Sequence, residues 1–182
     1  MSICVDAFQN KSFKLELVKY ESEERIVEII LDLLRTAVPK LLLEEKGCDN
    51  EPMRMDETAI DFVPPQFETK YFIVLSPTSQ KVKYSESIEQ KEVKYGFEVL
   101  INANSTDSKC LLWELIKVKN IVEAVLISSE LYIDHEDNPV TLDVSEIRFF
   151  DTQSENYNYF RRAAMITFSA SLYQFGKKVS IN

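Results

Sequence analysis

The chain has 182 residues, of which 45% are hydrophobic, including 11 phenylalanines and 8 tyrosines. This length suits one domain with a full hydrophobic core. Acidic side chains outnumber basic ones by 30 to 21, which gives a formal net charge of −9. Because such a chain repels phosphate backbones at long range, specific binding of DNA or RNA is not expected.

The cysteines and the N-terminal residues indicate a soluble, cytoplasmic protein. Cys4, Cys48 and Cys110 are far apart in the sequence and lack the close spacing of a metal or redox site, so we expect three reduced thiols. Residues 1–14 lack the basic and apolar regions of a signal peptide. No apolar run approaches the roughly 20 residues that span a bilayer, so no membrane association is expected.

The first quarter of the chain predicts an extended segment followed by a helix. Apolar and charged residues alternate over 13–17, so residues 1–20 form either a short strand or an extended arm, which packs on its own domain or reaches a neighbour. Ser22 then precedes two acids and a broad apolar stripe at helical spacing. Pro39 predicts either a kink or a helix restart that ends at Gly47.

Residues 59–101 predict strands. A short strand at 59–63 is followed by a buried strand at 70–76, which Pro77 is expected to end. The polar stretch 78–91 is either a hairpin arm or a flexible connection. Apolar and polar residues alternate over 91–101, which is typical of a strand with one buried face.

A second helix is expected at about 107–126, after turn and capping residues. Its buried stripe runs from Leu111 to Val125, with Trp113 and Ile116 beside it. The polar side is expected to carry Lys109, Glu114, Lys117 and Glu123.

Two strands are expected after this helix, at 140–150 and 160–175, with a polar loop at 151–159 between them. The order of helices and strands predicts one α+β domain over 1–182. We expect a mainly antiparallel sheet with two principal helices packed on it.

No constellation of catalytic residues stands out. His135 is the only histidine and lies among acids in a segment typical of a solvated turn, and one imidazole does not make a zinc site. The three glycines form no phosphate-binding loop or nucleophile elbow. We therefore expect no enzyme, no cofactor, no metal site and no catalytic residue.

Two groups of residues are candidates for binding partners. The stretch 130–157 is acidic and is either a solubilising surface or a patch that faces a basic partner or a lumen. Its candidate residues are Glu130, Asp134, Glu136, Asp137 and Glu155. The second group combines tyrosine and arginine, which are enriched at interface anchors, although chance surface placement explains it equally well. Its members are Tyr157, Tyr159, Arg161 and Arg162.

The second half of the chain resembles the tail-terminator proteins of long-tailed bacteriophages, also called tail-completion or head–tail joining proteins, and the caps of contractile injection particles. The resemblance lies in the order of helices and strands and in the pattern of residue types along them, without a diagnostic motif. It runs through Asp107-Ser108 and Trp113 on the helix, Ile147-Arg148-Phe149-Phe150, Tyr157-Asn158-Tyr159, Arg161-Arg162 and the strand from Ala164 to Tyr173.

This resemblance implies a virion structural protein that assembles in the host cytoplasm as a homo-oligomer, commonly a hexameric ring. Such a ring caps the tail tube, stops its polymerisation and presents a docking face to the head. The implied partners are the tail tube protein, the sheath in contractile tails and head-connector proteins, while DNA passes through without specific binding. The family carries no catalytic residue.

Other functions remain open. The segments 1–20 and 78–91 depart from small members of the family, and they would also suit another neck, head–tail connector or baseplate subunit. A different class is a monomeric ligand-binding or adaptor module. It would use the aromatic-rich sheet as a pocket, with Tyr71–Leu75, Tyr95, Phe97 and Trp113.

Overall fold

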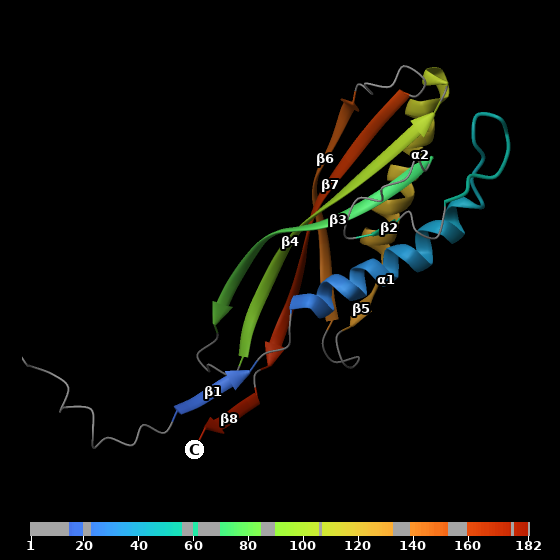
Figure 1. Cartoon of the computed structure of the whole chain (residues 1–182). Coiled ribbons are helices and arrows are strands. Elements are labelled where there is room, and N and C mark those ends of the chain that lie inside the picture. Colours follow the sequence, from blue (N-terminus) through green and yellow to red (C-terminus); the bar gives the residue numbers. More distant parts are fainter. Residues whose placement is uncertain are drawn as a thin grey trace, which may run out of the picture.

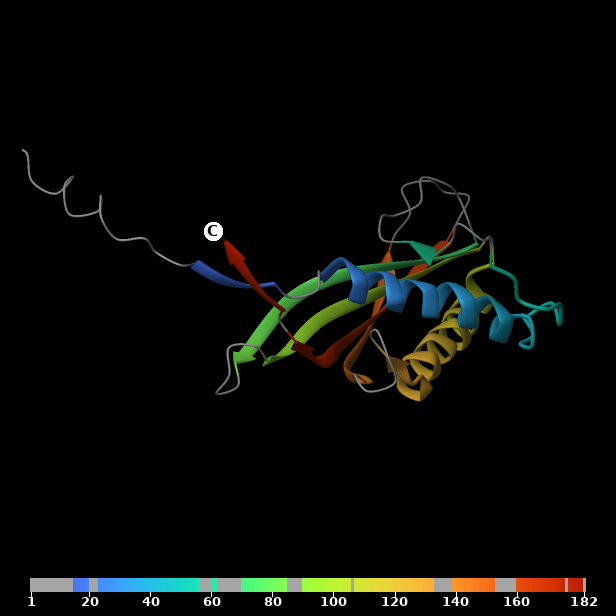
Figure 2. The same cartoon turned by 90° about the horizontal axis from the view of Figure 1, so that it is seen from below.

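The computed structural model describes residues 15–19, 23–55, 60–61, 70–84, 90–105, 107–132, 139–152, 160–175 and 177–181. They form a six-stranded, mostly antiparallel sheet, two helices and a separate two-stranded ribbon (Figure 1). Both helices lie on the same side of the sheet (Figure 2). The predicted α+β class is confirmed.

The sheet is built around two long central strands. Its order is β2 (Ile60–Asp61), β3 (Tyr71–Tyr84), β4 (Gln90–Ser105), β7 (Phe160–Phe175), β6 (Pro139–Thr152) and β5 (Leu131–Tyr132). Among the described strand pairs, only the short β2–β3 pair is parallel. The 16-residue strands β4 and β7 pair along their whole length, from Gln90 opposite Phe175 to Ser105 opposite Phe160.

Two predicted strand ends are wrong. Pro77 does not end β3, because the strand continues to Tyr84, which pairs with Lys91 of β4. The register shifts between Pro77 and Ser79, and the outer side of β3 has no described partner there, so the missing N–H of proline interrupts no ladder. The predicted loop at 151–159 also begins too early, since β6 includes Asp151 and Thr152.

The two helices follow the predicted stripes, with one correction. Helix α1 (Glu23–Leu42) neither restarts at Pro39 nor reaches Gly47; Pro39 lies in its last turn, and the backbone carbonyl of Pro39 accepts a hydrogen bond from Leu43 N at 3.3 Å. Helix α2 (Ser108–Ser128) begins after Asp107, whose side chain accepts a hydrogen bond from the backbone N–H of Lys109 at 2.8 Å. This bond satisfies one of the free donors of the first turn.

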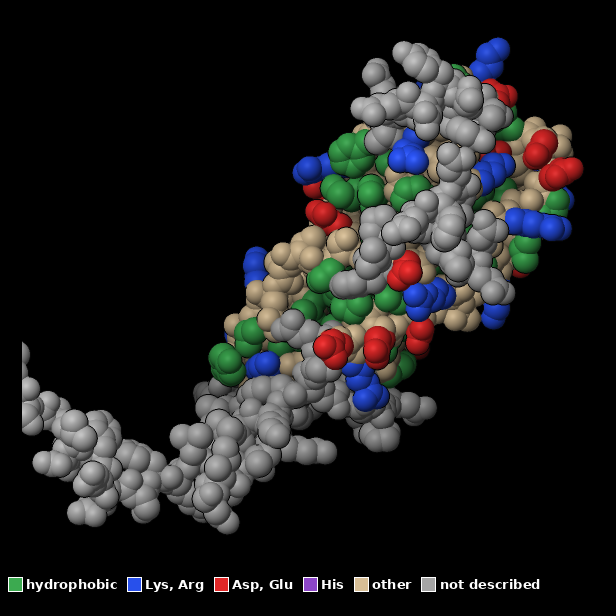
Figure 3. All heavy atoms as spheres, viewed as in Figure 1, with side chains coloured by type: hydrophobic (Ala, Val, Ile, Leu, Met, Phe, Trp, Pro, Cys, Tyr) green, Lys and Arg blue, Asp and Glu red, His purple; other side chains and the backbone are tan. Residues whose placement is uncertain are grey.

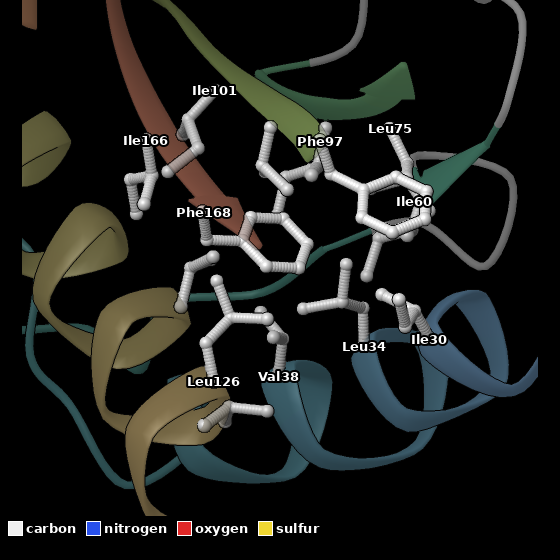
Figure 4. Packing of buried hydrophobic residues seen from close by; sticks show 14 of the residues in the cluster. Ile30, Leu34, Val38, Ile60, Leu75, Phe97, Ile101, Leu126, Ile166 and Phe168 are labelled. Atoms are coloured by element: carbon white, nitrogen blue, oxygen red, sulfur yellow. The ribbon is translucent and has the colours of Figure 1, made fainter. Parts of the chain in front are cut away.

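The main core lies between the helices and one face of the sheet (Figure 4). The alternating side chains of β4 and β7 point into it, and the rings of Phe97 and Phe168 stack with centroids 5.3 Å apart. Ile30, Leu34 and Val38 of α1 pack against them. The face that carries this core is thus filled with buried side chains from both helices and from five of the strands: β2, β3, β4, β6 and β7.

The two ends of the described chain pair with each other. Strand β1 (Leu15–Lys19) lies antiparallel to β8 (Lys177–Ile181), with Leu15 opposite Ile181. Figures 1 and 2 show this ribbon beyond one end of the six-stranded sheet. Of the two alternatives expected for residues 1–20, a short strand is observed at Leu15–Lys19, whereas β8 was not predicted.

Candidate interaction surface

Arg161 lies where β7 begins and β4 ends, on the sheet face away from the helices. Its Nε donates a hydrogen bond to Asn104 Oδ1 at 3.0 Å. Its guanidinium carbon lies 5.8 Å from the centroid of the Phe72 ring, within reach of a cation–π contact. The side chain is exposed yet held by β3 and β4, so it presents an oriented cation at this end of the sheet.

Arg162 belongs to the other face. It is half-buried and lies in register with Ala103 of β4 and Asp151 of β6. Because neighbouring strand residues point to opposite faces, the two arginines do not form one cluster.

Three phenylalanines are exposed at the same end of the sheet. Phe149 and Phe150 come from β6 and are 51% and 39% exposed, and Phe160 from β7 is 51% exposed. Figure 3 shows hydrophobic side chains at the surface over the upper parts of β6 and β7. By register, Phe149 and Phe160 lie on the helix face, whereas Phe150 and Arg161 lie on the face away from the helices. We call Phe149, Phe150, Phe160 and Arg161, which share one end of the sheet but not one face, the aromatic end. Large exposed apolar groups and an oriented arginine at one end of a sheet are typical of a protein interface.

The other predicted partner-binding residues are mostly outside the described residues. Glu130 is described: it is exposed just after α2, and its carboxylate accepts a hydrogen bond from the Tyr132 hydroxyl at 3.4 Å. The remaining candidates lie outside the described residues, and so does His135. These candidates are Asp134, Glu136, Asp137, Glu155, Tyr157 and Tyr159.

Glu114 was expected on the polar side of α2, but its carboxylate is buried. It is 4% exposed and accepts a 2.7 Å hydrogen bond from the Tyr71 hydroxyl. Lys70 Nζ lies 3.3 Å from the same carboxylate, and the backbone N–H of Cys48 donates to it at 3.5 Å. Glu114 therefore ties together α2, the start of β3 and the turn that follows α1.

The position of Glu114 was readable from helical spacing. It lies three residues after Leu111 and four before Val118, so it belongs to the buried stripe. Burial, followed by the hydrogen bond to Glu114, raises the pKa of the Tyr71 phenol well above its usual value. The phenol therefore remains a donor to Glu114 at neutral pH.

Trp113, the residue before Glu114, was expected beside the buried stripe but is 64% exposed. One position along a helix turns the side chain by about 100°, so burial of Glu114 carries Trp113 outward. Tyr71 and Phe97, which the ligand-binding alternative assigns to a pocket, are instead packed in the main core.

Cys48 and Cys110 are distant in sequence but interact in the structure. A hydrogen bond with Cys48, followed by burial, raises the pKa of the Cys110 thiol to about 12. Both cysteines are free. Because the thiolate is the reactive form, Cys110 is a poor nucleophile at neutral pH.

Among the described residues, no group of three or more histidine, cysteine or acidic side chains is arranged to hold a metal ion. No helix in this part of the chain is both long and apolar enough to cross a membrane. No protein-family model matches the sequence, and a comparison with curated proteins finds no matching relative. The candidate surface is therefore interpreted from its own residues.

Proposed function

We propose that this chain is a structural subunit of a phage-type tail or injection particle, in the role of a tail terminator. Copies would form a ring on the end of the tail tube, stop its polymerisation and offer a docking face to the head. The observation that carries the proposal is the aromatic end, where three exposed phenylalanines and a held arginine occupy the two faces of one end of the sheet.

The physical argument is that exposed aromatic area is costly unless a partner covers it. A buried phenylalanine is worth about 1.5–3 kcal/mol relative to an exposed one, so covering this end would stabilise an assembly. The surface lies on strands that continue into the main core. Such a rigid surface binds without a large cost of ordering.

The net charge of −9 is compatible with a ring around DNA. Contacts with phosphates are what hold DNA in place, so an acidic wall would let it slide through. As part of the proposal, some of the acidic residues in 130–157 face the lumen. A ring structure with these residues on the outer wall would remove this part and leave the terminator role untouched.

The test combines light scattering after size-exclusion chromatography with binding to purified tail tubes. We expect a mass several times that of one chain, alone or on tubes. The variant Phe149→Ser/Phe160→Ser should lose tube binding or assembly. Trp113→Ser, at an aromatic residue on α2 that is still more exposed, is the control and should change neither. A strict monomer that also ignores tail tubes would refute the proposal.

A neck, connector or baseplate subunit is the neighbouring alternative, because it would use the same kind of surface. The same variants separate the roles: a terminator binds the end of the tube, whereas a connector binds the head side without tubes. Electron microscopy of tubes mixed with the protein would locate it directly.

A further inference from the structure

The six-stranded sheet has long open edges on both sides. On one side, β2 pairs with only two residues of β3, so Leu75–Tyr84 has no outer partner among the described strands. On the other, β5 pairs with only the first two residues of β6, so Thr141–Thr152 is open within the same part of the chain. Unpaired backbone groups on an edge are a template for a strand from another chain.

The β3 edge carries lysines on one face and apolar groups on the other. Lys81 is in register with Lys94, so both Lys81 and Lys83 lie on the face away from the helices, where they are exposed. Val82 and Tyr84 lie on the helix face and are exposed as well. We call Lys81 and Lys83 the lysine edge.

The β6 edge repeats this alternation with acids. Asp143 and Glu146 are exposed on the face away from the helices, by their register with β7. Arg148 follows on the same face and donates two hydrogen bonds to the Glu146 carboxylate, at 2.7 and 2.8 Å, so the net negative charge of this edge comes from Asp143. Leu142 and Val144 lie on the helix face and pack partly against the main core. We call Asp143 and Glu146 the acidic edge.

We propose that the β3 edge of one copy pairs with the β6 edge of a second copy, so that the sheet continues from subunit to subunit. When two sheets join in this way, corresponding faces adjoin. The lysine edge then lies beside the acidic edge, and the exposed Val82 and Tyr84 lie beside the apolar residues of β6. The inference rests on the proposed function only in requiring that copies assemble.

The charges also select against the wrong pairs. Two lysine edges, or two acidic edges, would place like charges side by side, which is destabilising. Pro77 and the bulge after it limit pairing with a second copy to the part of β3 from Ser79 to Tyr84. A contact between two different edges is heterologous, so it propagates from copy to copy and closes into a ring when the rotation allows.

The experiment measures assembly of the full chain by light scattering over a range of concentration. Lys81→Glu/Lys83→Glu and Asp143→Lys/Glu146→Lys should each weaken self-association about 5- to 100-fold, because each reverses the net charge of one edge and so replaces attraction by repulsion. Mixing the two variants should restore assembly, because alternating copies present opposite charges at every contact. A misfolded variant would not be restored by mixing.

The matched controls reverse exposed charges away from both edges. Lys46→Glu/Lys109→Glu and Glu24→Lys/Glu28→Lys make the same changes in net charge and should leave assembly within twofold. An effect equal to that of the edge variants would assign the result to net charge and overturn the edge proposal.

The outcomes separate this inference from the proposed function. If the wild type assembles but neither edge variant weakens it, or if mixing restores nothing, the edge contact is wrong while the ring remains. If the wild type is monomeric and ignores tail tubes, the proposed function fails and the inference with it. Binding of a short DNA duplex that the lysine variant abolishes would assign these lysines to nucleic acid and overturn the proposal.

Discussion

The two faces of the six-stranded sheet differ in how completely the rest of the chain covers them. The helix face is covered by α1 and α2, and Glu114, the one buried carboxylate among the described residues, has three hydrogen-bond partners. Among the described residues, the other face has a small buried cluster around Phe72 and Val74, a buried Asn102 whose Nδ2 lacks a partner, and exposed charges. On the helix face, Gln174 Oε1 also lacks a partner, although Gln174 Nε2 donates a hydrogen bond to the Tyr95 hydroxyl. The difference suggests that stability resides on the first face, whereas the second face and the open edges are available for partners.

The largest loss of stability is expected from a substitution in the core on the helix face. Phe97→Ala removes a fully buried ring that stacks on Phe168 and should lower the free energy of unfolding by about 3–5 kcal/mol. Phe160→Ala, at the exposed aromatic end, should lower it by less than about 1 kcal/mol. Urea denaturation of both variants measures the difference. Equal losses would show that the two surfaces are not divided in this way.

A smaller loss is expected when the buried carboxylate loses its hydroxyl donor. Tyr71→Phe keeps the ring in the core but removes the 2.7 Å hydrogen bond to Glu114, which should cost about 1–3 kcal/mol. Lys70→Met is the companion variant, because Lys70 is half-exposed, and it should cost less. Urea midpoints at pH 7 would decide; no loss in Tyr71→Phe would mean that other donors compensate.

The same hydrogen bond predicts how stability depends on pH. The folded pKa of Tyr71 is raised, so the folded state keeps its proton above pH 10, where an unfolded tyrosine releases it. The contribution is complete below pH 10 and decreases as pH rises further toward the folded pKa. The stability difference between the wild type and Tyr71→Phe should therefore narrow between pH 9 and pH 11, as followed by urea titrations. A constant difference over this interval would contradict the assignment.

The helices and strands that form the helix face were predicted well, because each type of element leaves a periodic pattern of apolar residues in the sequence. Apolar residues at helical spacing located α1 and α2, and strict alternation located β4 and the closing strand β7. Glu114 and Trp113 were misplaced because residue type was weighed above position in the stripe. Helical spacing alone would have placed both correctly.

Edges and long-range pairs were less predictable. Pro77 is a strand breaker in the sheet interior but is harmless on an outer edge, and no local pattern shows which strand lies outside. The pairing of β1 with β8 joins the two ends of the chain and leaves no local trace. For the candidate surface, the sequence pointed to Arg161, whereas the exposure of Phe149, Phe150 and Phe160 depends on the order of strands in the sheet.

The smallest effect, and the sharpest contrast with Glu114, is expected at Asn102. Its side chain is buried on the face away from the helices, and its Nδ2 has no hydrogen-bond partner. Removing a buried donor without a partner recovers a desolvation cost of about 1–3 kcal/mol, which offsets the packing lost with the side chain. Asn102→Ala should therefore change the free energy of unfolding by less than about 1 kcal/mol, whereas Glu114→Ala should be clearly destabilising. A loss at Asn102 as large as at Glu114 would show that the amide is satisfied in solution, and that this face is as finished as the other.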